Sequence, residues 1–393
     1  MGKRRMFLKK SLSFGAGALA YNSASNAFAE TKKPSFKRNS PSDLVEVGMV
    51  VDHGCHSNGI WGDTMNPTEG KIRTTGMIIT KIWSFRKDYA QQFAAKFPGV
   101  EAVENIEDLV GRVDGIYIDA VPAVSLYHLI AKPFLMTGMP TFVNRPYSTS
   151  IEKARAMIND AETGGAPLMS NSTWEFAESV GALQAKAAGM PRILGYAAHN
   201  SMSDYYSHGI HGVYYIAAIL RNERKKGRGK CLAASYQTPD WRTPPGALSF
   251  IHENSDSGPF YGQLHLQSGM DGNAYMRLFG DSATGDFEGK IPASAGWFRY
   301  NTWNAMQLVI QEMFETGKAP ETGDDIMEKA YMFLMGFKSA LEKNGAPVTR
   351  EEIEDWELPP PGLALKKGNE PTDSAFSNPY SEEELKAFEK YLS

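Results

Sequence analysis

Polar side chains gather directly after the first apolar stretch of the chain, in the sequence VGMVVDHGCHSNGIW. Asp52, His53 and His56 follow a strand predicted over residues 45–51. Imidazole and carboxylate groups exchange protons near neutral pH and ligate divalent metals. The loop is therefore a candidate for acid–base or metal chemistry, with local hydrogen bonding by the two histidines as the alternative.

A second group of histidines lies in the segment SHGIH. The i, i+3 spacing of His208 and His211 places both on one face of a helix. In one interpretation His211 and a neighbouring tyrosine, for which we choose Tyr206, act as general acid and base. In the other, a divalent metal such as zinc or manganese is held by four histidines, His53, His56, His208 and His211.

Aromatic residues near these groups are candidates for substrate contacts. Tyr205 precedes the histidine pair, Trp174 lies in SNSTWEF, and Trp241 lies in a Pro-rich loop. For each of them packing in the core is the competing interpretation.

The order of predicted elements indicates an α/β protein. Strands alternate with helices up to about residue 165, which predicts a Rossmann-like parallel sheet. The next region is rich in strands without intervening helices, which predicts an α+β domain with a largely antiparallel open sheet. The predicted division is an export signal (1–29), a linker (30–43), a Rossmann-like domain (44–165), a substrate domain (166–345) and a Pro-rich C-terminal extension (346–393).

Composition limits the class of partner. Of 393 residues, 42% are hydrophobic and 22% charged, as in folded proteins. The formal net charge of -4 and the lack of a long basic run argue against nucleic acid. Cys55 and Cys231 are too few for a disulfide framework, so unpaired thiols are expected.

The N-terminal sequence MGKRRMFLKKSLSFGAGALAYNSASNAFAE predicts export. Arg4 and Arg5 precede a short, weakly apolar stretch and a small-residue site at residues 27–29, as in twin-arginine signals. The stretch is too short for a stable membrane span. We expect a periplasmic or otherwise exported protein.

Residues 113–150, VDGIYIDAVPAVSLYHLIAKPFLMTGMPTFVNRPYSTS, resemble the glucose–fructose oxidoreductase, inositol dehydrogenase and MocA-like family (Gfo/Idh/MocA). The residues that fit its pattern are Asp114, Pro122, His128, Gly138, Val143 and Pro146. The later HGIHGVYYIAAIL resembles the family's substrate-domain helix, with His211 at its histidine. The resemblance implies a two-domain enzyme that oxidises or reduces sugars or inositols with NAD(P).

The resemblance also implies a nucleotide site, from which this chain departs. Val51 and His53 stand where the family has glycines of its diphosphate turn. The implied cofactor-binding positions are Asp52, His53, Gly54, His56, Ser84, Arg86 and Pro122. Because Ser84 and Arg86 suit a ribose phosphate, they favour NADP, with a solvated helix-start residue as the alternative for Arg86.

Two further departures concern catalysis. Asn144-Arg145-Pro146 replaces Glu-Lys-Pro, and Arg145 cannot shuttle a proton but can clamp a carboxylate. Ser207 stands where many family members have Asp, four residues before His211.

Three functions remain open from the sequence. The first is an exported sugar oxidoreductase with tightly bound NAD(P). The second is a non-redox polysaccharide lyase or glycosidase that acts on an acidic sugar through His/Tyr chemistry, with or without a metal. The third is a binding protein without catalysis. The expected partner is a small-molecule or polymeric carbohydrate, and the C-terminal extension is expected to cover the protein body or a partner subunit of a homo-oligomer.

Overall fold

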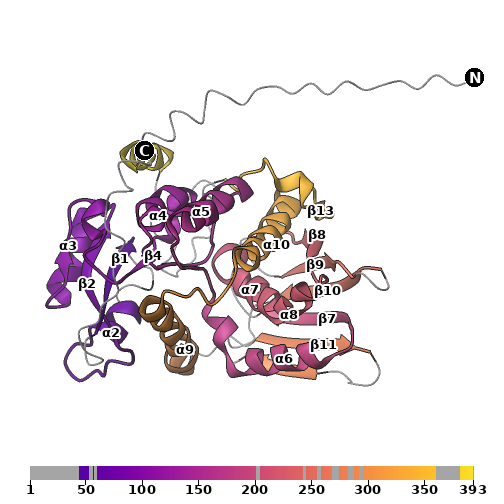
Figure 1. The fold of residues 1–393 in the computed structure, drawn as a ribbon. Coiled ribbons are helices and arrows are strands. Elements are labelled where there is room, and N and C mark those ends of the chain that lie inside the picture. Colours follow the sequence, from indigo (N-terminus) through magenta and orange to yellow (C-terminus); the bar gives the residue numbers. More distant parts are fainter. Residues whose placement is uncertain are drawn as a thin grey trace, which may run out of the picture.

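The computed structural model describes residues 44–52, 56, 60–200, 204–241, 245–254, 258–267, 274–281, 287–291, 295–359 and 381–392. These residues form two sheets with helices around and between them (Figure 1). The predicted export signal and the whole predicted linker lie outside the described residues.

The first sheet is parallel, with strand order β3-β2-β1-β4-β5-β6. Its strands are β1 (Val45–Val51), β2 (Met77–Ser84), β3 (Glu101–Ala102), β4 (Gly115–Asp119), β5 (Thr141–Val143) and β6 (Leu168–Met169). Every residue of β4 and β5 is buried, because helices cover both faces of a parallel sheet. The strand order reverses between β1 and β4, which is where doubly wound sheets bind ligands.

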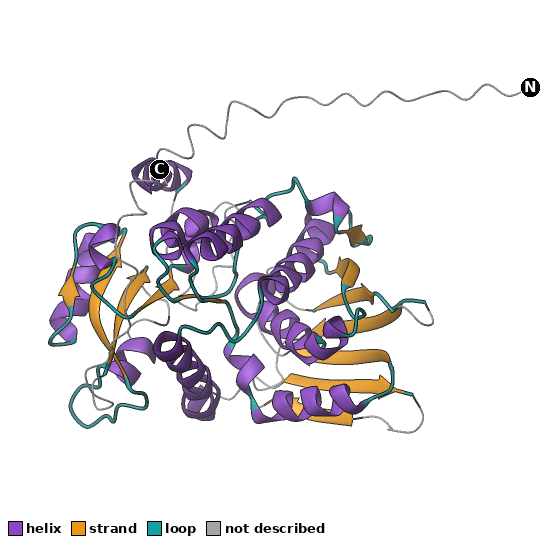
Figure 2. Ribbon diagram, in the orientation of Figure 1, coloured by secondary structure: helices purple, strands orange, loops and turns teal. Residues whose placement is uncertain are grey.

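Helices cover both faces of this sheet (Figure 2). One face carries α4 (Tyr127–Met136) and α5 (Ile151–Gly164). The other carries α2 (Gly62–Met65), α3 (Lys87–Lys96) and α9 (Ala295–Thr316). α9 lies within the range predicted for the substrate domain, and buried residues of α9 pack on the first sheet, among them Trp303, Met306, Ile310 and Phe314.

The second sheet is mixed and mostly antiparallel, with order β12-β11-β7-β10-β9-β8-β13. Its strands are β7 (Ile193–Asn200), β8 (Cys231–Gln237), β9 (Gly246–His252), β10 (Phe260–Leu266), β11 (Ala274–Gly280), β12 (Phe287–Ile291) and β13 (Val348–Thr349). The predicted fold class is confirmed. One face packs on helices, and the other exposes Leu194, Leu232, Tyr261 and Phe279.

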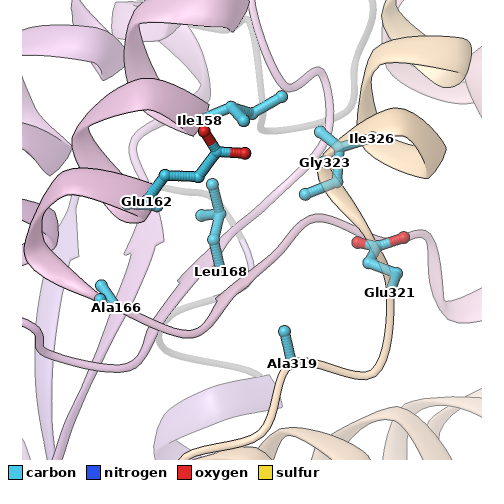
Figure 3. A pocket seen from close by; sticks show the side chains of 10 residues that line it. Ile158, Glu162, Ala166, Leu168, Ala319, Glu321, Gly323 and Ile326 are labelled. Carbon is cyan, nitrogen blue, oxygen red and sulfur yellow. The ribbon is translucent and has the colours of Figure 1, made fainter.

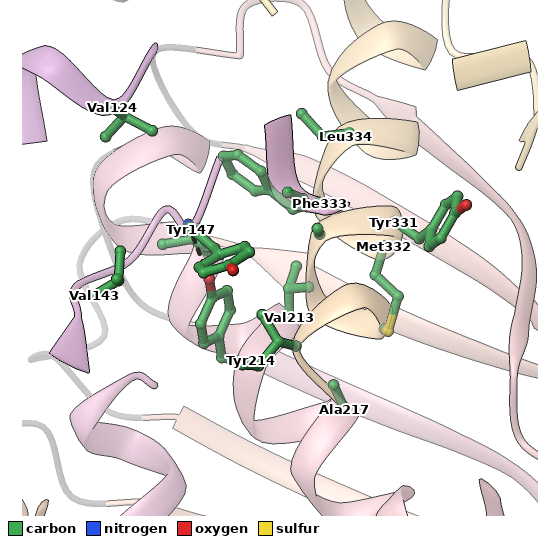
Figure 4. Packing of buried hydrophobic residues seen from close by; sticks show 14 of the residues in the cluster. Val124, Val143, Tyr147, Val213, Tyr214, Ala217, Tyr331, Met332, Phe333 and Leu334 are labelled. Carbon is green, nitrogen blue, oxygen red and sulfur yellow. Dashed lines mark hydrogen bonds between the residues drawn. The ribbon is translucent and has the colours of Figure 1, made fainter. Parts of the chain in front are cut away.

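Helices at the centre of the molecule join the two sheets. These are α6 (Glu178–Gly189), α7 (Ile210–Ile219), α8 (Arg221–Lys225) and α10 (Gly323–Glu342). The backbone N–H of Tyr147, just after β5, donates a 3.2 Å hydrogen bond to the Tyr214 hydroxyl of α7 (Figure 4). Phe333 and Met332 of α10 extend the same apolar cluster. A single packed core therefore fixes α7 against the first sheet.

Short helices complete the fold. They are η2 (Ile106–Leu109), η3 (Val121–Leu126), η4 (Thr173–Phe176), the π turn η5 (Tyr205–Gly209), η6 (Glu351–Ile353) and the C-terminal α12 (Glu382–Leu392). No helix among the described residues is long and apolar enough to cross a membrane. Cys231 is buried and unpaired, as expected, whereas Cys55 lies outside the described residues.

Candidate functional site

A buried carboxylate marks the carboxyl edge of the first sheet. Asp119, the last residue of β4, is fully buried beside the point where the strand order reverses. The Trp61 indole N–H donates to Asp119 Oδ2 over 2.6 Å, and the Asn144 amide donates to Oδ1 over 2.6 Å. His56 Nδ1 lies 3.1 Å from Oδ2. The carboxylate therefore orients three side chains at the ends of neighbouring strands.

These contacts keep Asp119 ionised. Burial alone would raise the pKa of Asp119, but the charge and hydrogen bond of His56 oppose burial, helped by Trp61 and Asn144. The net effect lowers the pKa below its ordinary value. The ionised carboxylate of Asp119 therefore lies beside His56 Nδ1.

His56 in turn faces Arg145, which follows β5. Arg145 Nη2 lies 3.5 Å from His56 Nε2, and Arg145 is only 4% exposed. The His56 ring also packs on Trp303 of α9, with centroids 4.8 Å apart. A guanidinium held this deeply interacts strongly with any negative charge that develops beside it.

A π turn presents the second histidine group. Asp204 caps η5 by accepting the Ser207 backbone N–H over 2.6 Å, and its carboxylate also accepts the Ser207 hydroxyl. His208 Nδ1 lies 2.7 Å from Ser207 Oγ and 3.3 Å from Asp204 Oδ2. Ser207 stands where many members of the family have Asp, and in this chain Asp204 supplies a carboxylate beside His208 instead. π turns are frequent at functional sites.

His211, at the start of α7, is held from the segment between β6 and η4. Its Nδ1 lies 2.6 Å from Ser172 Oγ, and its ring stacks on Trp174 at 5.1 Å and 15°. Burial lowers the pKa of His211 well below its ordinary value, and the charges of Arg145, His208 and His56 lower it further. His211 is therefore neutral at physiological pH, the state required of a base.

Site residues expected from the two domains interact: the His208 and His211 ring centroids are 6.3 Å apart, and the charges of Arg145 and His56 act on His211. Arg145 and His56 from the first sheet and His208 from η5 all act on His211. These groups are far apart in the sequence, so they lie near one another only because of the tertiary fold. Residues named by the sequence thus converge where β1, β4 and β5 end near α7.

A buried ion network supports the segment that holds His211. Lys329 of α10 donates to Ser170 O over 2.8 Å and lies 2.6 Å from Glu321 Oε2 and 3.1 Å from Glu175 Oε2. Glu175 accepts the backbone N–H of Ser172 over 2.8 Å. Beside Glu321 lies a mainly apolar hollow of ≈ 210 Å³ (Figure 3), apart from the histidines.

The nucleotide end of the site fits a cofactor only in part. Ser84 ends β2, and Arg86, 24% exposed at its side chain, lies 3.7 Å from Asp52. Around the expected diphosphate position, Asp52 and Asp119 add buried negative charge, and α2 spans only 4 residues. Residues 53–55 and 57–59, which include His53 and Gly54, lie outside the described residues.

Several predicted contacts lie in the core instead. Tyr205 is fully buried and donates its hydroxyl to Phe333 O over 3.1 Å, which agrees with the competing interpretation of packing in the core. Tyr206 packs on Phe333 and Phe337, and Trp241 also packs on Phe337. Because α10 carries several aromatic residues, these rings pack on α10.

Two other predicted residues take supporting positions. Trp174 is fully buried, and its ring supports the His211 imidazole rather than an open site. Pro122 is fully buried in η3, directly after β4. Among the described residues, no group of three or more His, Cys, Asp or Glu could hold a metal ion, and His53 falls outside them.

The sequence analysis missed four residues that shape the site. Asp119, Trp61, Asp204 and Ser172 were not singled out. Asp119 has a recognisable signal, an acidic residue that ends a fully apolar strand at the carboxyl edge. Asp204 has another, an i, i+4 spacing to His208. Trp61 and Ser172 have no such signal, because their roles depend on tertiary contacts.

Comparisons with known proteins support this architecture. A family model described as "Oxidoreductase family, NAD-binding Rossmann fold" (Gfo/Idh/MocA) matches residues 64–172. No curated protein matches the chain.

Among solved structures, a myo-inositol dehydrogenase from Lactobacillus casei in complex with NAD(H) and myo-inositol is similar, with a TM-score of 0.64 and 12% identity over 84% of this chain and 99% of its own. A probable dehydrogenase from Thermotoga maritima has a TM-score of 0.62 and 13% identity over 79% of this chain and 100% of its own. GenD2 from gentamicin A biosynthesis, in complex with NAD, has a TM-score of 0.60 and 13% identity, over 80% and 98%. The chain thus has the two-domain fold of these proteins, and its residues 64–172 match the Rossmann domain of the Gfo/Idh/MocA oxidoreductases.

Proposed function

We propose that this protein is an NAD(P)-dependent oxidoreductase that acts on a small polyhydroxylated carbohydrate. The observation that carries the proposal is the convergence of a neutral His211 with Arg145 and His56 at the carboxyl edge of the first sheet. In doubly wound sheets this edge is where nucleotide and substrate meet.

His211 is the proposed base. When its Nδ1–H donates to Ser172 Oγ, the lone pair of Nε2 is available to take a proton from a substrate hydroxyl. Stacking on Trp174 fixes the plane of the ring. The low pKa of His211, which follows from burial and neighbouring cations, keeps this nitrogen unprotonated in neutral solution.

Arg145 is the proposed electrostatic partner. It stays charged at all physiological pH values, so it stabilises negative charge on the substrate oxygen and does not relay protons. His56, backed by the buried Asp119, helps to orient the guanidinium. His208, held by Asp204 and Ser207, is the proposed second hydrogen-bonding group for the sugar.

For the cofactor, Ser84 and Arg86 are the proposed contacts to the ribose end. A nicotinamide bound here would supply a hydride acceptor or donor for the carbon that bears the reacting hydroxyl. The support is the match of residues 64–172 to an NAD-binding family model and the NAD complexes among similar folds. The twin-arginine-like N-terminus adds the proposal of export with the nucleotide tightly retained, because an exported enzyme has no cytoplasmic nucleotide pool.

A non-redox reaction is the second candidate, and one observation favours it. Asp52 and Asp119 place buried carboxylates beside the expected diphosphate position, while Arg145 replaces the family's lysine. An arginine that clamps a uronate carboxylate would acidify the neighbouring C–H for a histidine base. That reaction is a lyase step on an acidic sugar and needs no nucleotide.

Nucleotide analysis separates the two candidates. The native protein is purified from its exported fraction, denatured, and its supernatant assayed for NAD and NADP. The oxidoreductase proposal expects close to one nucleotide per chain, followed by its reduction when inositols or sugars are added to the native protein. Absence of nucleotide, together with unsaturated product from an acidic polysaccharide, would establish the lyase candidate instead.

A further inference from the structure

The C-terminal helix α12 packs on the first sheet near the carboxyl ends of its strands. Leu385 is buried, and Phe388 and Leu392 pack against the same core cluster as α4. α12 also contacts α4 and η3, the segment that follows β4 (Figure 1, beside the C label). The last turns of the chain therefore return to the nucleotide-type domain.

Aromatic side chains of α12 cover the residues that flank Ser84. The Phe388 ring lies on the Phe85 ring, with centroids 4.0 Å apart and an interplanar angle of 24°. Tyr391 stacks parallel to Trp83 at 6.3 Å and 11°. A centroid distance of 4.0 Å is van der Waals contact, so nothing fits between Phe85 and Phe388.

α12 also brings a carboxylate toward Arg86. Hydrogen bonds from the backbone and hydroxyl of Ser381 lower the pKa of Glu384, and the charge of Arg86 adds to this effect. Glu384 is thus ionised near the cation proposed to receive a ribose phosphate. An aromatic ring and a negative charge are the two groups that the adenosine end of a dinucleotide would bring to this edge.

We propose that α12 is an autoinhibitory cap that occupies the adenosine end of the nucleotide site, with the Phe388 ring in place of the base. The inference rests on the proposed NAD(P) dependence. In this account nucleotide and α12 exclude each other, so the cap closes the empty site and leaves it when the cofactor is loaded.

The helix has the properties of a displaceable element. It spans 11 residues, and Ser381 and Glu384 form a reciprocal cap at its start, with distances of 2.7 and 3.1 Å. Tyr391 is 49% exposed even when docked. An isolated helix this short is marginal in water, so an undocked α12 unfolds and becomes open to proteases.

The test compares nucleotide affinity in the full-length, nucleotide-stripped protein. The double variant Leu385→Asp/Phe388→Glu removes the apolar contacts of the cap. Ala387→Glu, which adds a charge at an exposed position of the same helix, is the matched control. Binding of NAD and of NADP is measured by calorimetry, and limited trypsin digestion at Lys386 and Lys390 reports undocking.

We expect the double variant to bind one of the nucleotides about tenfold more tightly than the wild type, as for a cap docked in roughly nine of ten nucleotide-free molecules. The control should match the wild type. Equal or weaker binding in a double variant whose helix is digested would overturn the cap and leave the proposed function standing. No binding of either nucleotide by any of the three proteins would overturn both.

Discussion

His211 and His252 are both buried histidines, yet their ring nitrogens are bonded differently. His252 lies in β9, with Nε2 2.8 Å from the Tyr196 hydroxyl and Nδ1 3.0 Å from Gly229 O. His211 has Nδ1 2.6 Å from Ser172 Oγ, and within the described residues Nε2 has no such partner. A histidine with hydrogen-bond partners at both ring nitrogens has a structural role, whereas one with a ring nitrogen that lacks a protein partner can bind a ligand.

The surroundings differ in charge as well. Burial lowers the pKa of His252 to about 3, the hydrogen bond to the Gly229 carbonyl opposes this effect, and the charges of Arg224 and Arg350 add to it. Around His211, burial is joined by the charges of Arg145, His208 and His56. Perturbed groups surrounded by further titratable groups are typical of functional sites, whereas a perturbed pKa on its own is not.

The largest expected effect separates the two histidines by activity. His211→Asn should lower kcat/KM by about 10²–10⁴-fold, because it removes the proposed base. His252→Asn should leave kcat/KM close to the wild-type value. Steady-state kinetics with the preferred sugar decide this, and comparable losses in both variants would erase the distinction between site and framework.

The next largest effect is expected for the stability of the fold when Lys329, the buried lysine that supports the segment holding His211, is replaced. Lys329→Met removes the cation paired with the buried Glu175 and leaves Glu321 with Arg221 alone, and should destabilise the fold by about 3–5 kcal/mol. Lys343→Met, which breaks an exposed pair with Glu352, is the control and should cost less than about 1 kcal/mol. Urea unfolding measures both. A small loss in the buried variant would mean that the network does not hold the segment.

A smaller effect concerns the framework histidine. His252→Asn cannot span from Tyr196 to Gly229, so a buried polar group is left unsatisfied. The expected loss is about 1–3 kcal/mol in the free energy of unfolding. Thermal or denaturant unfolding measures it, and a neutral result would show that water replaces the missing ring.

The smallest effect is on the pH dependence of stability. The pKa of His252 is about 3 in the folded chain against 6.5 in the unfolded one, so the unfolded state binds more protons between these values. Stability should be full above pH 6.5 and fall as the pH drops below it, by at most about 1.4 kcal/mol per pH unit for this histidine. His252→Asn should flatten the profile. An unchanged slope would assign the acid sensitivity to other groups, such as His128, whose pKa burial lowers to about 4.

Much of the fold follows from local sequence patterns. The apolar run at residues 45–51 locates β1 at its observed ends. The sheet on which α9 packs could not be predicted. An amphipathic pattern shows that a helix buries one face, but it does not show against which sheet. The same limit applies to α12.

For the site, residue type and family resemblance located His211, Arg145, His208 and His56, which the fold brings together. They did not indicate that Tyr205 packs on α10, because its environment depends on residues more than a hundred positions later in the chain. Asp119 acts through partners that are distant in the sequence, and Asp204 acts through partners within four residues. Sequence spacing gives only a weak signal for either residue. Side-chain identity thus indicates the chemistry, while tertiary packing decides which candidates meet.

The most direct test of the account is the nicotinamide absorbance of the native protein, with and without His211. The purified wild type is mixed with a panel of inositols and sugars, and the reduced nicotinamide is followed in a single turnover. We predict reduction with at least one polyol in the wild type and its near loss in His211→Asn with the nucleotide still bound. Equal reduction in the two proteins would contradict the role of His211, and a native protein that neither carries nor binds NAD(P) would contradict the proposed reaction itself.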